Sequence, residues 1–176
     1  MKSNTLIFSL FFGGIILVIF FSCQPPQIIS KQPSTNTSAT PSVSSVNKNL
    51  LTQLINNVRQ QGCNCGTTKM PPVSDITWNS QLEVAALKHV KDINQKKIFS
   101  HIGLDGADPG DRIIRAGYSW RTFGENIANG YQNEQAVVAG WLKSVGHCKN
   151  IMNSAYKEMG VAKSGIYWVQ VFATKR

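Results

Sequence analysis

Acidic residues are scarce in this sequence. Its 176 residues include 9 Asp and Glu against 18 Lys and Arg, which gives a formal net charge of +9. A chain this basic can meet anionic lipid headgroups, wall polymers or acidic glycans. No basic run with interleaved aromatic residues occurs, which argues against nucleic acid as a partner. The basic residues are instead scattered and indicate a solvated surface, which includes Lys88, Lys91, Lys96, Lys97, Arg112 and Arg115.

Familiar catalytic signatures are absent as well. The chain contains neither an HExxH zinc motif nor a GxSxG nucleophile elbow. Ser100 adjoins His101 and Ser144 precedes His147, but neither pair belongs to such an elbow. Cys148 follows His147 directly, and neighbouring side chains usually point apart. The sequence therefore disfavours covalent catalysis.

A long apolar run lies near the N-terminus, at residues 6–21, behind a short basic start. This pattern is typical of a secretory signal, and the run is short for a membrane span. Ser22-Cys23 resembles a bacterial lipoprotein box. We therefore predict a lipoprotein-type signal peptide at residues 1–22 and lipidation of Cys23; an ordinary cleaved signal and an uncleaved anchor are the alternatives. All three predict an exported protein, either a cell-envelope lipoprotein or a secreted protein.

The next segment has no aromatic residue. Residues 23–47 are rich in Ser, Thr, Pro, Asn and Gln, and such a composition buries too little apolar surface to order a chain. We predict a disordered tether there. Residues 48–176 have the length of one compact domain with one core.

Cysteine is rare, with four in the chain. With Cys23 assigned to lipid, Cys63, Cys65 and Cys148 remain, and export allows disulfide formation. Cys63 and Cys65 are too close in sequence to pair without strain, so the predicted disulfide joins Cys148 to either Cys63 or Cys65. A metal site built on Cys63 and Cys65 is a weak alternative, because their spacing is Cys-x-Cys rather than Cys-x-x-Cys.

Periodicity and capping residues indicate helices around a few strands. The first expected helix covers Leu50 to Val58 and stops at Gly62, and the second begins at Ser80 in a capping box with Glu83. The third runs from Pro109 to Gly117 with Asp108 as its N-cap, and the fourth runs from Glu134 to Ser144. The chain should then turn at Gly146. Strands are expected at residues 123–127, 158–162 and 166–173. This order predicts a sheet covered by helices.

The three histidines and one glutamate carry the candidate chemistry. His89 lies on the apolar stripe of the second helix and is interpreted as a core residue. Glu125 lies in an apolar, glycine-flanked segment, where a carboxylate is costly to bury unless it is paired or binds a ligand. We predict that His101, Glu125 and His147 meet in one cavity. They would form either a Zn²⁺ site with a polarised water or a hydrogen-bonded network that binds nothing.

The residues from 48 to 176 resemble the CAP superfamily, which comprises cysteine-rich secretory, antigen 5 and pathogenesis-related class 1 proteins and is also called the SCP domain. The resemblance is carried by ITWNSQLEVAALKHVKDI, IFSHIGLDG, DRIIRAGY, GENIANG, VVAGWLKSVGHCKNIMNSAYKEMGVA and YWVQVFA. The short loops are similar to the bacterial branch. The resemblance implies an α+β fold, a three-layer α-β-α sandwich, with His101, Glu125 and His147 around one central cavity. Ser144 stands where eukaryotic members often carry a second glutamate.

Together these features predict an exported, non-catalytic binding module. Its cavity would contain His101, Glu125 and His147, with Ser144, Asn126 and Asn150 beside them, and would hold Zn²⁺ or a water. We expect a cell-envelope or wall component, a lipid or a protein as partner, and contact with the membrane through the lipid anchor only. The alternatives are a metal-assisted hydrolase of peptide or cell-wall material, with the same three residues as catalytic candidates, and a lipid- or sterol-binding module.

Overall fold

The computed structural model describes residues 46–176. The predicted signal peptide, the predicted lipidation at Cys23 and the tether up to residue 45 lie outside these residues. At the start of the described part, Asn47 caps the first helix, because its side chain accepts a hydrogen bond from the Leu50 amide. No helix within residues 46–176 is long and apolar enough to cross a membrane.

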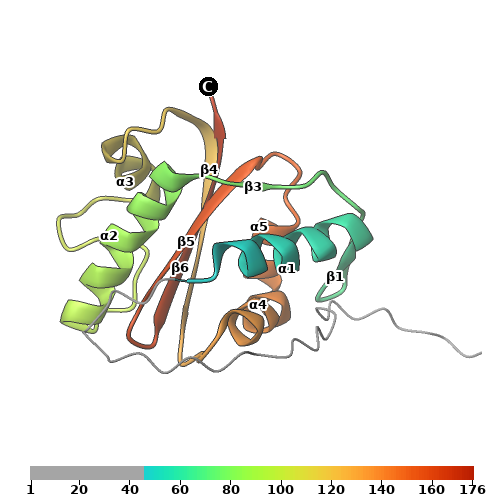
Figure 1. The fold of residues 1–176 in the computed structure, drawn as a ribbon, viewed down its shortest axis with the longest axis horizontal. Coiled ribbons are helices and arrows are strands. Elements are labelled where there is room, and N and C mark those ends of the chain that lie inside the picture. The colour runs from blue at the N-terminus through green and yellow to red at the C-terminus, as the bar shows by residue number, and fades with distance from the viewer. Residues whose placement is uncertain (1–45) are drawn as a thin grey trace, which may run out of the picture.

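Five helices and six strands make up the described domain (Figure 1). The helices are α1 Lys48–Gln61, α2 Ser80–Lys96, α3 Pro109–Arg115, α4 Glu134–Lys143 and α5 Val145–Ile151. The strands are β1 Cys63–Cys65, β2 Thr68–Met70, β3 Thr77–Trp78, β4 Trp120–Asn129, β5 Glu158–Ser164 and β6 Tyr167–Lys175. Strands β1 and β2 form a small hairpin of their own.

The main sheet has four strands in the order β3-β5-β6-β4. Strand β3 runs parallel to β5, and the other neighbours are antiparallel. Strand β6 lies inside the sheet and is almost entirely buried, which agrees with its run of β-branched and aromatic residues. The long strand β4 forms one edge of this sheet, and Glu125 lies on it.

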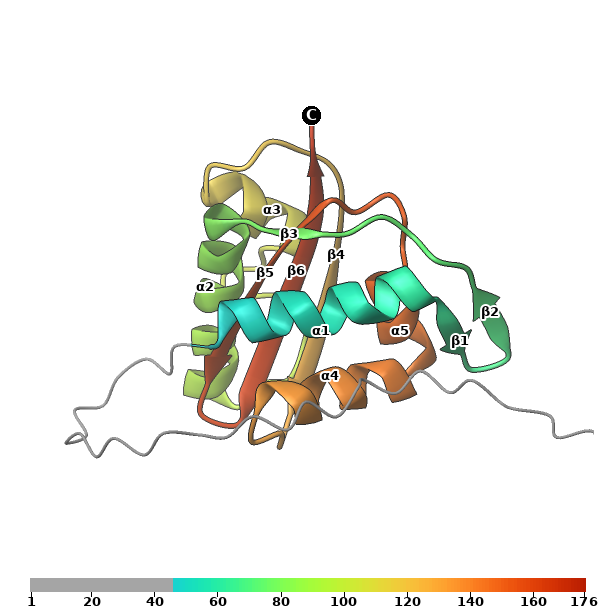
Figure 2. The same ribbon diagram turned by 45° about the vertical axis from the view of Figure 1, so that its right-hand side comes forward.

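Helices cover both faces of the sheet (Figures 1 and 2). One buried cluster packs α1, α4 and α5 on one face, and it includes Leu54, Trp141 and Phe172. A second cluster packs α2 and α3 on the other face, and it includes Val90 and Val171. This arrangement confirms the three-layer α-β-α sandwich.

Two local predictions at helix starts were wrong. The chain does not turn at Gly146, because a second short helix, α5, begins one residue earlier and carries both His147 and Cys148. Helix α2 is capped by Asn79 rather than by Ser80, since the Asn79 side chain accepts hydrogen bonds from the amides of Gln81 and Leu82. The predicted N-cap Asp108 is confirmed.

Gly160 on β5 allows α2 to lie directly against the sheet. A Cβ atom at Gly160 would overlap the backbone of Leu82 and Glu83 at the start of α2. We therefore expect Gly160→Ala to lower the free energy of unfolding by about 3 kcal/mol, at the upper end of overpacking effects. Urea denaturation measures this loss. Gly146→Ala is the matched control, because it meets no atom within 4 Å and lies in a helix, where alanine should leave stability unchanged or raised.

Candidate functional site

Glu125 lies at the edge of the sheet, where both helical layers can reach it. Side chains alternate along β4, so Ile127 belongs to the buried cluster under α2 and α3 while Ala128 belongs to the cluster under α1, α4 and α5. Glu125 has the same parity as Ile127 and therefore faces the α2 and α3 layer. Asn126 faces the opposite layer, toward α5.

The Glu125 carboxylate is buried and has a partner on each oxygen. Its Oε2 accepts a hydrogen bond from Arg112 Nη2 at 2.7 Å, and its Oε1 lies 2.8 Å from His101 Nδ1. The side chains of Glu125 and Arg112 are 2% and 3% exposed, whereas His101 is 50% exposed. The structure thus brings together two of the predicted residues, His101 and Glu125.

Arg112 is the member of this site that sequence reasoning missed. It was assigned to the solvated basic surface, and that assignment is wrong: Arg112 is buried and ion-paired with Glu125. Its Nη1 also donates to the Ala107 carbonyl at 2.8 Å, which fixes the loop before α3. The sequence offered little evidence for its burial, because α3 has only seven residues and Arg112 stands there between Gly110 and Ile113, which are buried.

His89 lies behind the carboxylate as a neutral core residue. Its Nε2 is 2.8 Å from the Ser100 carbonyl and 3.7 Å from Glu125 Oε1, and its Nδ1 has no partner among the described residues. Burial lowers the pKa of His89 from its usual value. A neutral ring that donates from Nε2 to Ser100 explains this geometry. The interpretation of His89 as a core residue is confirmed.

His147 approaches from the other helical layer. It lies in the first turn of α5, and Asn126 Nδ2 donates to its carbonyl at 3.3 Å. Asn150 ties the same helix to β4, because its Nδ2 lies 3.2 Å from the Glu125 carbonyl and 2.9 Å from Asn126 Oδ1. Burial and, to a smaller extent, the neighbouring His101 lower the pKa of His147. That His147 meets His101 and Glu125 in one cavity stays a prediction.

Ser144 occupies the junction between α4 and α5. It is the N-cap residue of α5, its side chain makes no capping hydrogen bond, and its carbonyl accepts from the Cys148 amide at 2.8 Å. Its place in the cavity stays a prediction.

A pocket of about 250 Å³ lies between α2 and α3. Arg112 belongs to its wall, whereas His101, Glu125 and His147 do not. The lining residues are Val84, Ala85, Lys88, Asp92, Asp105, Arg112, Arg115 and Ala116. Arg112 is thus both a lining residue of this pocket and the ion-pair partner of Glu125.

The cysteines form a second cluster, between the β1–β2 hairpin and α5. Cys65 and Cys148 form a disulfide with a Cα–Cα distance of 5.5 Å, which is one of the two predicted pairings. Cys63 Sγ lies 3.7 Å from Cys148 Sγ. Within residues 46–176 this trio is the only group of three metal-ligating residue types with ligand atoms within 4.8 Å of one another. Because Cys65 and Cys148 are joined by a disulfide, this cluster is a structural bridge between the β1–β2 hairpin and α5.

The sequence model of the cysteine-rich secretory protein (CAP) family matches residues 52–172. The chain belongs to this family. Protein YkwD of Bacillus subtilis is 33% identical over 149 residues, an alignment that covers 83% of this chain and 54% of YkwD. The chain therefore spans about half the length of that relative.

Solved structures agree with this assignment. An extracellular protein of Bacillus anthracis that contains an SCP domain has 29% sequence identity and a TM-score of 0.65, with 73% of this chain and 40% of that chain covered. The structure of NaASP2 with Zn²⁺ has 16% identity and a TM-score of 0.51, with 77% and 83% covered, and shows the shared fold. A bacterial CAP domain with an α+β fold is thereby established.

Proposed function

We propose that this CAP domain is an exported binding module that holds a divalent cation, such as Zn²⁺, between His101 and His147. The observation that carries the proposal is the contact between His101 Nδ1 and the buried Glu125 carboxylate. A histidine that donates one ring nitrogen to a carboxylate presents the other nitrogen as a metal ligand, an arrangement typical of protein metal sites. Export is supported by the extracellular relative from Bacillus anthracis.

The residues at this site fit a zinc ion. With Nδ1 directed at Glu125, the Nε2 atom of the half-exposed His101 is an acceptor. The lowered pKa of His147 favours its neutral ring, which is the form that binds metal. Both carboxylate oxygens of Glu125 already have partners. We therefore assign Glu125 the role of orienting His101 rather than of binding the metal directly, so two histidines would be the protein ligands. A bound ion would supply a positive centre open to solvent and to a partner's oxygen atoms.

The same geometry favours a binding module over a hydrolase. A general base needs a carboxylate free to take a proton from the attacking water. Glu125 is instead held by an arginine on Oε2 and by a histidine on Oε1. The proposed partner is a component of the cell envelope that coordinates the bound ion.

Calorimetric titration with zinc tests this function. The purified protein should bind about one equivalent with a dissociation constant in the micromolar range, and His101→Ala/His147→Ala should abolish the heat of binding. Glu125→Gln should weaken binding about tenfold, which is the usual effect of removing a carboxylate that orients a histidine ligand.

His89→Gln is the matched control, because it removes the third histidine and keeps a side chain that can donate to the Ser100 carbonyl. Its zinc affinity should equal that of the parent, with folding verified by circular dichroism. Equal zinc binding by the parent and the double variant would reject His101 and His147 as the ligands. Turnover of a peptide or wall substrate that disappears in His147→Ala would favour the hydrolase instead.

A further inference from the structure

The loop that joins α2 to α3 exposes several large apolar side chains around His101. Ile98, Phe99, Ile102 and Leu104 are each between 47% and 55% exposed, and all belong to residues 98–104. Single exposed apolar residues are common on protein surfaces, but a contiguous group of them indicates an interaction site. We call residues 98–104 the apolar loop.

The exposure of the apolar loop is fixed by hydrogen bonds beneath it. The Ser100 carbonyl points inward to His89 Nε2 at 2.8 Å, and the Ser100 hydroxyl accepts from the Ile102 amide at 3.0 Å. At the end of the loop, the Gly103 amide donates to the Ala107 carbonyl at 2.9 Å. These contacts satisfy polar backbone groups of the loop, while its apolar side chains stay exposed.

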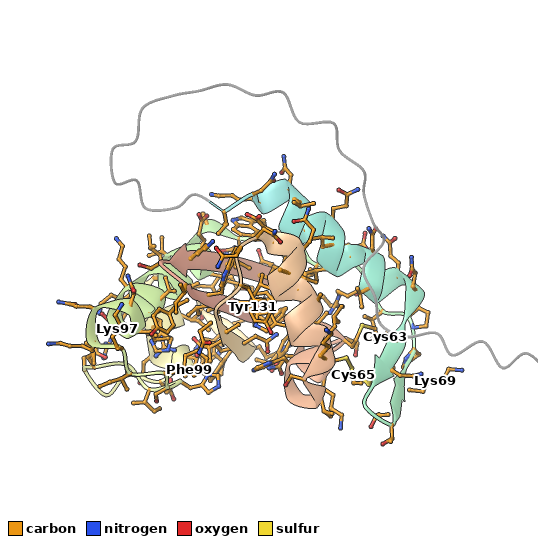
Figure 3. The ribbon with its side chains drawn as sticks, turned by 90° about the horizontal axis from the view of Figure 1, so that it is seen from below. Cys63, Cys65, Lys69, Lys97, Phe99 and Tyr131 are labelled. Atoms are coloured by element: carbon orange, nitrogen blue, oxygen red, sulfur yellow. A yellow bond between two sulfur atoms is a disulfide. The ribbon has the colours of Figure 1, made fainter. Side chains whose placement is uncertain are left out.

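Lysines border the apolar loop. Lys91, Lys96 and Lys97 are exposed on the C-terminal half of α2 and its cap. Lys97 Nζ lies 5.5 Å from the centre of the Tyr167 ring, and the Phe99 ring lies 6.3 Å from that same ring. In Figure 3, Lys97 and Phe99 lie at one end of the molecule, whereas Lys69 lies at the opposite end.

The nearby acidic residues do not cancel this charge. Asp92 forms an ion pair with Lys88 at 2.7 Å, and Asp105 forms one with Arg115 at 2.5 Å. Asp108 and Asp111, beyond the loop at the start of α3, are held in its capping box. Lys91, Lys96 and Lys97 outnumber these two carboxylates, so the charge around the apolar loop stays positive. Apolar side chains bordered by lysines are the combination that binds the interface of an anionic bilayer, through burial of the apolar groups and attraction of the lysines to the headgroups.

We propose that the apolar loop inserts into the surface of an anionic lipid membrane, with Lys91, Lys96 and Lys97 at the level of the headgroups. This contact would be additional to any lipid anchor, in contrast to the expectation of an anchor alone. It would place His101 at the membrane surface. The inference goes beyond the proposed metal binding and does not depend on it.

Vesicle co-sedimentation tests the proposal. Every protein lacks residues 1–23, so that neither the apolar run at residues 6–21 nor lipid attached at Cys23 can contribute. The parent should bind vesicles containing 30% phosphatidylglycerol in phosphatidylcholine at least tenfold more tightly than pure phosphatidylcholine. We expect Phe99→Ser/Ile102→Ser to reduce binding to the anionic vesicles about tenfold, because less apolar surface is buried, and Lys96→Glu/Lys97→Glu to reduce it by about as much.

Matched controls separate this site from a generally basic surface. Val145→Ser changes an aliphatic side chain of similar exposure on α5, and Lys69→Glu/Lys143→Glu reverses two exposed lysines elsewhere. Both controls should bind like the parent. Three results would overturn the proposal. The first is an equal loss of vesicle binding in Lys69→Glu/Lys143→Glu and Lys96→Glu/Lys97→Glu. The others are unchanged binding by Phe99→Ser/Ile102→Ser and a parent that does not bind the anionic vesicles. As a second measurement, brominated acyl chains should quench the added fluorescence of Phe99→Trp but not that of Val145→Trp.

Discussion

Arg112→Met should lower the free energy of unfolding by about 3–5 kcal/mol, one of the two largest losses we expect from a single substitution in this domain. The main cause is the Glu125 charge that remains buried without its partner, rather than the loss of the Arg112–Glu125 contact itself. Without Arg112, the Glu125 carboxylate is still buried, with the half-exposed His101 as its remaining close partner. The Ala107 carbonyl also loses its donor. Urea denaturation followed by circular dichroism measures the effect.

The double variant Arg112→Met/Glu125→Gln distinguishes an uncompensated charge from lost packing. Neutralising Glu125 should restore at least half of the stability lost in Arg112→Met, which means strong coupling between the two sites. If the stability loss of the double variant equals the sum of the losses in Arg112→Met and Glu125→Gln, the uncompensated charge is not the cause. In that case Arg112 would stabilise the domain through its packing and its contact with Ala107 alone.

Arg112 also shows where sequence reasoning stopped. The apolar periodicity of α1, α2 and α4 and the β-branched run of β6 depend on neighbours along the chain, and all four elements were predicted. The burial of Arg112 depends on a carboxylate 13 positions away that faces the same helical layer. No local pattern encodes that contact, so a buried arginine could not be told from a solvated one.

Part of the candidate site could be predicted from the sequence, and part of it depends on contacts between distant elements. The sequence singled out His101 and Glu125 by their chemistry, and the structure places them in contact. It could not foresee that His147 lies in a helix, because Gly146 indicated a turn. It also could not foresee that Glu125 faces one helical layer while α5, which carries His147, belongs to the other. That arrangement depends on which face of β4 the Glu125 side chain takes and on which side of the sheet α5 packs.

This location gives strand β4 a specific role. Strand β4 is an edge strand, so no further strand separates the two helical layers beyond it. Helix α5 is attached to β4 through the side-chain amides of Asn126 and Asn150. The position of His147 therefore depends on the placement of α5. The placement of α5 depends in turn on Arg59, which binds the carbonyls of Ile151 at the end of α5 and of Asn153 and Tyr156 beyond it.

Arg59→Met should lower the free energy of unfolding by about 3–5 kcal/mol, since it leaves several carbonyl groups without donors in and near the core. Arg59 lies on α1 and is fully buried, and burial lowers its pKa from the usual value. Its guanidinium donates to the carbonyls of Ile151 at 2.6 Å, Ser74 at 2.8 Å, Asn153 at 3.0 Å and Tyr156 at 3.2 Å. One side chain thereby joins α1 to the end of α5 and to the segment that leads into β5.

Arg59→Lys is the matched control, because it keeps the charge but replaces the planar fork of donors with a single ammonium group. It should lose less than Arg59→Met, yet still destabilise the domain, because one ammonium cannot reach all four carbonyls. Calorimetry adds a second readout. If Arg59 positions α5, zinc should bind more weakly to folded Arg59→Lys at a temperature well below its unfolding transition, whereas Gly160→Ala, which acts on α2, should bind zinc like the parent. Unchanged zinc affinity in Arg59→Lys would mean that the contacts of α5 with β4 suffice to hold His147 in place.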